Sequence, residues 1–125
     1  MSFEPDPLSI PFWDAAGEHR LVVQRCTSCG EHQFYARPYC VRCSGEVEWV
    51  DASGTGTIYS ATTVHLQVKD DLEPPYDVAI VELDEGPRVI STLAAGEAVI
   101  GTRVRVDWRD RDGAPPLPVF VTEPR

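Results

Sequence analysis

All four cysteines of the chain lie within eighteen residues, and this cluster constrains the fold more than any other feature. They form two C-x-x-C pairs, Cys26 with Cys29 and Cys40 with Cys43, with ten residues between the pairs. A C-x-x-C pair can make a tight turn, here called a knuckle, that points both sulfurs at one centre. Two knuckles supply the four thiolates of a tetrahedral metal site, and Gly30 suits the left-handed turn that a knuckle often needs. The spacing therefore predicts a metal-binding ribbon with these four cysteines as ligands.

The spacing does not decide which metal is held, because four thiolates suit both zinc and iron. We expect Zn²⁺ in a structural role, with iron as the alternative, since four cysteine ligands leave no open coordination position for water or substrate. Two disulfides fit less well, because no secretory signal is visible before the cluster and cytoplasmic thiols stay reduced. A redox-active dithiol would need only one C-x-x-C pair. We therefore expect a cytoplasmic protein with one closed metal centre.

Short β-prone runs flank the knuckles at residues 21–26 and 47–52, and a third lies between them at residues 33–35. Together they predict a zinc ribbon over residues 21–50. A segment of this length buries too little apolar surface to form a core alone, so metal binding would supply much of its folding free energy. The whole chain is predicted to be mostly β, in three parts: an N-terminal helical segment (1–20), the ribbon (21–50) and a β-barrel (51–125).

The N-terminal segment reads SIPFWDAAGEH at residues 9–19 and predicts a helix, because a proline is tolerated in the first turn. Ile10, Trp13 and Ala16 recur at helical spacing, so we expect them to form an apolar stripe beside Phe12. This stripe either packs onto the ribbon or docks on another protein. Since large aromatic side chains are common at the centre of protein interfaces, Phe12 and Trp13 are candidate partner-binding residues.

After residue 51 the apolar residues alternate, which is typical of half-buried strands. The alternation puts Ile58 and Val64 on one face of the first strand and leaves residues 109–116 as a charged loop. Pro118 indicates a sheet edge or a bulge, because proline cannot donate a ladder hydrogen bond. Five strands favour a small OB-fold barrel, with an SH3-like barrel as the alternative. The predicted strands cover residues 57–68, 76–83, 88–94, 102–108 and 117–123.

Charge and motifs narrow the possible functions. The chain has 20 Asp and Glu against 11 Lys and Arg, a net charge of −9, so it lacks the basic surface that phosphate-backbone binding needs. Arg103 and Arg105 could still line one barrel face, so an OB-fold nucleic-acid-binding protein stays as the alternative function. No apolar run is long enough for a membrane span. Ser60, His65 and Asp77 could form a triad only on paper, since no nucleophile turn surrounds the serine, and we expect no catalytic residues.

Several stretches together resemble the DUF35 family. They are the FW pair of the N-terminal segment, LVVQRC at the first knuckle, RPYCVRC at the second, and above all SGTGTIYSATTVH at residues 53–65 and PYDVAIVELDEGPR at residues 75–88. The similarity covers nearly the whole chain. It implies a rubredoxin-like zinc ribbon followed by an OB-fold, and the family's four metal positions correspond to Cys26, Cys29, Cys40 and Cys43.

The resemblance also implies a function. The chain would be a non-catalytic subunit that joins a thiolase-like enzyme (a thiolase, an acyltransferase or a thiolase-like aldolase) in a hetero-oligomer. It would help to hold or channel the enzyme's acyl-CoA, in a pathway such as steroid or lipid side-chain degradation, as a separate subunit or as a domain of a longer protein. Because the chain is acidic, we expect the partner to hold most of the CoA phosphates, with local help from Arg37, Arg42 or Lys69. The family's Pro-Pro-Arg pattern before the second knuckle reads Ala36-Arg37-Pro38 here.

Overall fold

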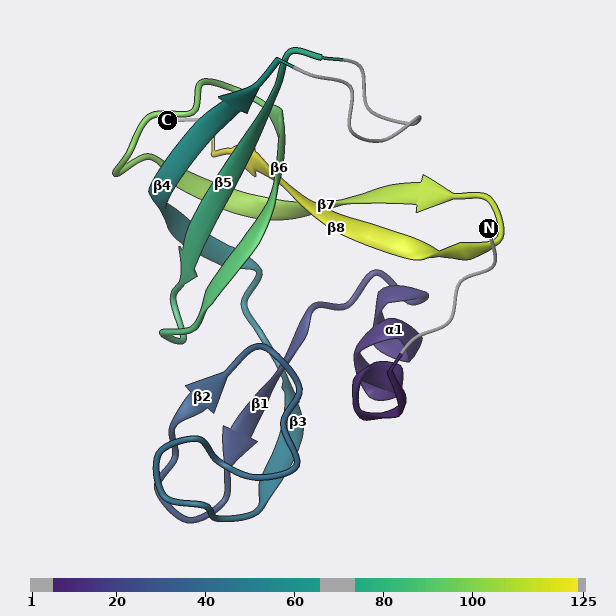
Figure 1. Ribbon diagram of the computed structural model, residues 1–125, viewed down its shortest axis with the longest axis vertical. Helices are drawn as coiled ribbons and strands as arrows, with labels where there is room; N and C mark the ends of the chain where they lie inside the picture. The colour runs from purple at the N-terminus through teal and green to yellow at the C-terminus, as the bar shows by residue number, and fades with distance from the viewer. Residues whose placement is uncertain (1–5, 66–73, 124–125) are drawn as a thin grey trace.

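A computed structural model describes residues 6–65 and 74–123, which form a small ribbon sheet, a larger barrel and a short helix between them (Figure 1). The ribbon sheet has three antiparallel strands in the order β2-β1-β3. They are β1 (Val22–Cys26), β2 (His32–Gln33) and β3 (Val47–Asp51). The middle strand β1 ends at the first cysteine, so the sheet leads directly into the first knuckle.

The second sheet closes into a five-stranded barrel of strand order β4-β5-β6-β8-β7, in which β7 returns to pair with β4. The pairing of β6 with β8 is parallel and the other described pairings in the barrel are antiparallel. This architecture confirms the predicted OB-type barrel. The strands are β4 (Thr55–Val64), β5 (Tyr76–Leu83), β6 (Arg88–Ala95), β7 (Arg103–Arg111) and β8 (Ala114–Thr122).

The N-terminal helix is shorter than predicted. A 3₁₀ turn, η1 (Pro7–Ser9), leads into α1 (Ile10–Ala16), and the chain then turns until His19, whose φ of 57° is incompatible with a continued helix. The predicted stripe was also wrong, because Ile10 is exposed and Trp13 is only half-buried. Since α1 packs against β8 and β1 at once, its buried face consists of Phe12, Ala15 and Ala16.

One hydrophobic core joins the helix, the ribbon and the barrel. Phe12 of α1 and Val23 of β1 belong to the same buried cluster as Ile58, Val81 and Phe120 of the barrel. Strand β1 is therefore anchored by apolar packing as well as by the cysteines at its end. Among residues 6–65 and 74–123, no helix has the length and apolar character needed to cross a membrane.

The first barrel strand departs from strict alternation. Its ladder with β5 shifts between Ile58 and Ser60, so Tyr59 is the extra residue of a β-bulge and its side chain is exposed. One extra residue moves the side chains that follow to the opposite face, and Ala61 packs on the core. The predicted face shared by Ile58 and Val64 was therefore wrong. Residues 66–68 of the predicted strand lie outside the described residues.

The predicted loop at residues 109–116 was wrong, because this stretch forms the tip of a β7–β8 hairpin. Arg109 pairs with Leu117 and Arg111 pairs with Ala114, around a turn in which Gly113 has a φ of 73°. Three prolines are tolerated because the first half of β8 pairs only with β7, and β6 joins β8 only near its end, at Phe120. The expectation that Pro118 marks a sheet edge is confirmed. Figure 1 shows the hairpin reaching over α1.

Candidate metal centre and neighbouring groove

The four cysteine sulfurs come together at the tip of the ribbon. The Sγ atoms of Cys26 and Cys43 are 3.4 Å apart, those of Cys29 and Cys40 are 3.7 Å apart, and all four lie within 4.8 Å of one another. Four thiolates around one zinc ion, with Zn–S bonds of about 2.3 Å, would place neighbouring sulfurs about 3.8 Å apart. The donor set and its spacing therefore fit a single tetrahedral metal ion.

The two knuckles are built alike, which explains why they face one centre. The N–H of Gly30 donates to the Cys26 carbonyl at 3.0 Å, and the N–H of Ser44 donates to the Cys40 carbonyl at 2.9 Å. Both donor residues have a left-handed backbone conformation, with φ of 78° for Gly30 and 64° for Ser44. The predicted left-handed Gly30 is confirmed, whereas Ser44 in the equivalent position was not expected, because serine is not the usual residue there.

Backbone donors also favour the ionised form of the two buried thiols. The pKa of Cys26 is lowered to about 6, chiefly by the hydrogen bond from the Cys29 N–H at 3.4 Å. The pKa of Cys40 is lowered by the N–H groups of Cys43 and Arg42. A thiolate is the form that binds a cation, so the knuckle backbones prepare two of the four ligands for metal binding. Four protein ligands leave no open position for catalysis.

Two glutamines hold the loop between β2 and the second knuckle. The Gln24 side chain accepts from the Arg37 N–H and donates to the Arg37 carbonyl, both at 3.0 Å. Gln33 donates to the Gln24 side chain at 2.7 Å and to the Tyr39 carbonyl at 3.2 Å, and it accepts from the Val41 N–H at 3.0 Å. These bonds satisfy backbone groups of residues 37–41, which do not belong to a described strand, and they fix the loop in place.

Of the three predicted CoA-contact residues, the structure describes Arg37, in the loop after β2, and Arg42, in the second knuckle. The Arg37 side chain lies on the exposed part of the loop, and Arg42 binds Glu31, with 2.9 Å between Nη1 and Oε1. Lys69 lies outside the described residues. Neither of the two described arginines lines the groove between α1 and the barrel.

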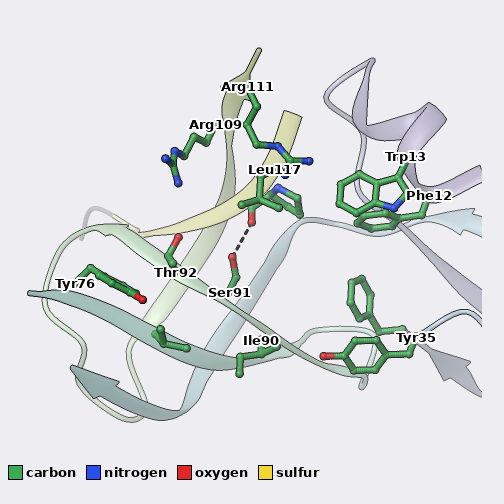
Figure 2. Close-up of a pocket in the computed structure, with 13 residues that line it drawn as sticks. Phe12, Trp13, Tyr35, Tyr76, Ile90, Ser91, Thr92, Arg109, Arg111 and Leu117 are labelled. Carbon is green, nitrogen blue, oxygen red and sulfur yellow. Dashed lines mark hydrogen bonds between the residues drawn. The ribbon is translucent and has the colours of Figure 1, made fainter. Parts of the chain in front are cut away.

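That groove has a volume of about 390 Å³ and lies between α1, the loop after β2 and the barrel. It exists because β6 and β8 pair only near their ends, at Leu93 with Phe120 and Ala95 with Val121, so their first halves separate. Aromatic side chains supply much of its wall, and two arginines of β7 lie along one side (Figure 2). The aromatic residues are Phe12, Trp13, Phe34, Tyr35 and Tyr76.

The aromatic wall is packed edge to face. The rings of Phe12 and Phe34 are 5.5 Å apart at 84°, and those of Phe12 and Trp13 are 4.9 Å apart at 85°. Both side chains line the groove, but Phe12 is only 7% exposed and packs mainly in the core, whereas Trp13 is half-buried. The predicted partner-binding pair therefore lies at the groove.

Arg109 and Arg111 were not predicted as groove residues, because residues 109–116 were expected to form a charged loop. The signal that could have found them is the Asp112-Gly113 dipeptide, a strong two-residue hairpin turn. Continuing β7 up to that turn would have placed both arginines on a barrel strand. The prolines that follow, Pro115, Pro116 and Pro118, are unfavourable inside a sheet. Here they lie in the part of β8 that pairs with β7 alone.

Comparisons with known proteins cover nearly the whole chain. Residues 13–48 match the ChsH2 rubredoxin-like zinc ribbon domain, and residues 49–109 match the ChsH2 C-terminal OB-fold domain. A solved chain of the Ltp2-ChsH2(DUF35) aldolase is 35% identical with a TM-score of 0.85, and the match covers 96% of this chain and 98% of that one.

Three named relatives extend these matches. A probable enoyl-CoA hydratase alpha subunit of Thermomonospora curvata is 41% identical over 87% of this chain and 36% of its own length. A DUF35 domain-containing scaffold protein of Methanocaldococcus jannaschii is 33% identical over 83% of this chain and 79% of its own length. The benzoylsuccinyl-CoA thiolase subunit BbsA of Geobacter metallireducens is 35% identical over 73% of this chain and 60% of its own length. This chain thus spans only about a third of the hydratase subunit.

Proposed function

Because the chain belongs to the DUF35 family of zinc-ribbon and OB-fold proteins, we propose that it is a non-catalytic subunit of a thiolase-like enzyme and helps to hold that enzyme's acyl-CoA substrate. The observation that carries this proposal is the end-to-end match to a chain of the Ltp2-ChsH2(DUF35) aldolase. A relative named as a scaffold protein and another named as a thiolase subunit support the same role.

The names of two relatives support the substrate class. Two of them act, by name, in CoA thioester chemistry, as an enoyl-CoA hydratase subunit and a benzoylsuccinyl-CoA thiolase subunit. We extend this to an acyl-CoA held jointly with the partner, in lipid or steroid side-chain degradation in the cytoplasm.

The non-catalytic role is consistent with the described side chains. The four cysteines occupy one closed centre. Asp77, the acid of the triad considered from sequence, accepts a hydrogen bond from the Thr63 hydroxyl at 2.7 Å. This contact directs the carboxylate along the β4–β5 ladder and gives it a structural partner.

We propose Zn²⁺ as the resident metal, with a structural role. The family model is that of a zinc ribbon, and the sulfur spacing fits Zn–S bonding. Metal analysis of the purified chain should find one zinc per chain in a colourless protein. A red protein that contains iron would overturn this assignment.

Co-expression tests the partnership. The chain and the thiolase-like enzyme encoded beside it should elute together in size-exclusion chromatography, and the purified complex should turn over an acyl-CoA. If the two proteins elute separately and the enzyme is fully active alone, the proposed function is wrong.

The nucleic-acid alternative gains no support from the barrel face. Arg103 makes two hydrogen bonds to Asp84, at 2.7 Å and 2.9 Å, so its charge is already balanced by a carboxylate. Single-stranded DNA or RNA that binds in a salt-dependent way at physiological ionic strength would revive this alternative.

A further inference from the structure

The described lining of the groove between α1 and the barrel carries positively charged side chains and no carboxylate. The net charge is −9, yet the described lining of the groove includes two arginines and no Asp or Glu. Both arginines come from the last part of β7, Arg109 and Arg111. An acidic protein that concentrates two guanidinium groups at one hollow offers local complementarity to an anion.

Two contacts help to hold Arg111 in position. Its Nε donates to the Pro115 carbonyl at 2.9 Å across the hairpin, and its guanidinium carbon lies 5.6 Å from the centre of the Trp13 ring. Figure 2 shows Arg111 extending towards Trp13, with Leu117 beside it and Tyr35 and Ile90 on the opposite side of the groove. A guanidinium fixed beside an aromatic ring can bind a carboxylate next to an apolar group without first losing much side-chain freedom.

The rest of the lining is suited to hydrocarbon. Apart from the arginines, aromatic rings and the aliphatic side chains of Val78, Ile90 and Leu117 supply most of the surface. The Ser91 hydroxyl donates to the Pro118 carbonyl at 2.6 Å, so it is already engaged within the wall. A volume of about 390 Å³ lies within the range of small-molecule sites.

We propose that this groove binds the part of the acyl group farthest from the thioester, and that this part is an apolar ring or chain carrying a carboxylate. The inference rests on the proposed function, in which the thioester itself reacts on the partner. The aromatic and aliphatic walls bury the apolar part, and Arg109 and Arg111 pair with the carboxylate. The CoA phosphates are not the anion, because the polar nucleotide around them does not match a largely hydrocarbon wall.

The binding test uses the full zinc-loaded chain and 2-naphthoate as the probe, with 2-naphthalenemethanol as the matched neutral compound. Calorimetry gives the affinities. The NMR signals of the three tryptophan indole N–H groups give the location of binding, and a Trp13→Phe variant identifies the signal of Trp13. We expect the Trp13 signal to shift and that of Trp108, which stacks on His19, to stay. Trp49 lines a smaller neighbouring hollow and serves as a second reference. The alcohol should bind at least about tenfold more weakly, because it lacks the charge-assisted hydrogen bonds.

Arginine variants test the assigned anion partners. A double Arg109→Met, Arg111→Met variant should lose the preference for naphthoate over the alcohol. Arg111→Lys should keep part of it because the charge remains. Arg105→Met is the matched control, because Arg105 is an exposed residue of the same strand outside the groove lining, and it should bind as the unmodified chain does. Circular dichroism of each variant excludes misfolding as the cause.

Three results would overturn the inference. They are equal binding of acid and alcohol, unchanged naphthoate binding in the double variant, and a Trp13 shift produced by CoA without an acyl group at lower concentration than by naphthoate. Partner binding is measured separately, and the double variant should still elute with the thiolase-like enzyme. If the unmodified chain does not form this complex, the proposed function is wrong. The naphthoate titration would still decide what the groove binds.

Discussion

Replacing Gln24 with methionine tests whether the glutamine pair holds the ribbon loop. Gln24 is 3% exposed and makes three hydrogen bonds, two with the Arg37 backbone and one with Gln33. Methionine has a similar size but makes none of them. At about 0.5–1.5 kcal/mol for each bond, the free energy of unfolding should fall by about 1.5–4.5 kcal/mol.

Urea denaturation at one fixed zinc concentration measures this loss, because bound metal adds stability by mass action. Amide hydrogen exchange at Arg37 and Val41 should also become faster, since both N–H groups depend on the glutamine pair. Arg25→Met on the same strand is the control. Its ion pair with Glu48 is long, at 3.5 Å, and about half exposed, so its removal should cost less than about 0.5 kcal/mol. A Gln24 variant as stable as this control, with unchanged exchange, would refute the reasoning.

Further stability predictions follow from the knuckles and the barrel. Gly30→Ala should lower the free energy of unfolding by about 1–2 kcal/mol, because alanine resists the left-handed conformation. Ser44→Gly should raise it by up to about 1 kcal/mol. If urea denaturation shows both variants to be less stable, or both more stable, this account is wrong. Phe120→Ala should lower the free energy of unfolding by about 3–5 kcal/mol, since the ring is 1% exposed in the core, and a loss below about 1 kcal/mol would contradict this role of Phe120. Arg103 and Thr55 lower the pKa of Asp84 to about 2, so the carboxylate adds stability above its ordinary pKa and loses that effect as the pH falls through about 2. Because both charged side chains are more than two-fifths exposed, Asp84→Asn should cost only about 1 kcal/mol at pH 7, and the difference from the unmodified chain should shrink in acid.

Metal removal should act mainly on the knuckles. Because Val23 shares the common core with the barrel, strand β1 is expected to stay packed after chelation, while amides near Cys29 and Cys43 exchange faster. Hydrogen exchange before and after treatment with a strong chelator measures this difference. Uniform melting of the ribbon and barrel together would show that the metal supports the whole fold, and no change at all would argue against a structural metal.

The cysteine cluster and the barrel could be predicted because their signals are local. Two C-x-x-C pairs determine which sulfurs can share an ion, whatever the rest of the chain does. In the same way, apolar and charged residues alternate at positions 103–106, which predicts one strand with two different faces. The burial pattern of β7 follows this alternation.

The features that were missed depend on contacts distant in sequence. The bulge at Tyr59 is a property of the β4–β5 pairing and leaves no mark in the spacing of β4 alone. The prolines of β8 are compatible with a strand only because that stretch has one neighbour, which follows from the topology. The groove combines α1, the loop after β2 and the barrel strands, so no spacing along the chain could have predicted that Trp13 and Arg111 meet.

The rate of the thiolase-like enzyme as a function of added chain tests the central claim most directly. The enzyme, purified without this chain, is assayed on its acyl-CoA while the zinc-loaded chain is added in increasing amounts. The proposed role predicts a rate that rises and saturates at a fixed ratio of the two proteins, with no turnover by the chain alone. An enzyme rate that is the same with and without the chain would contradict the account.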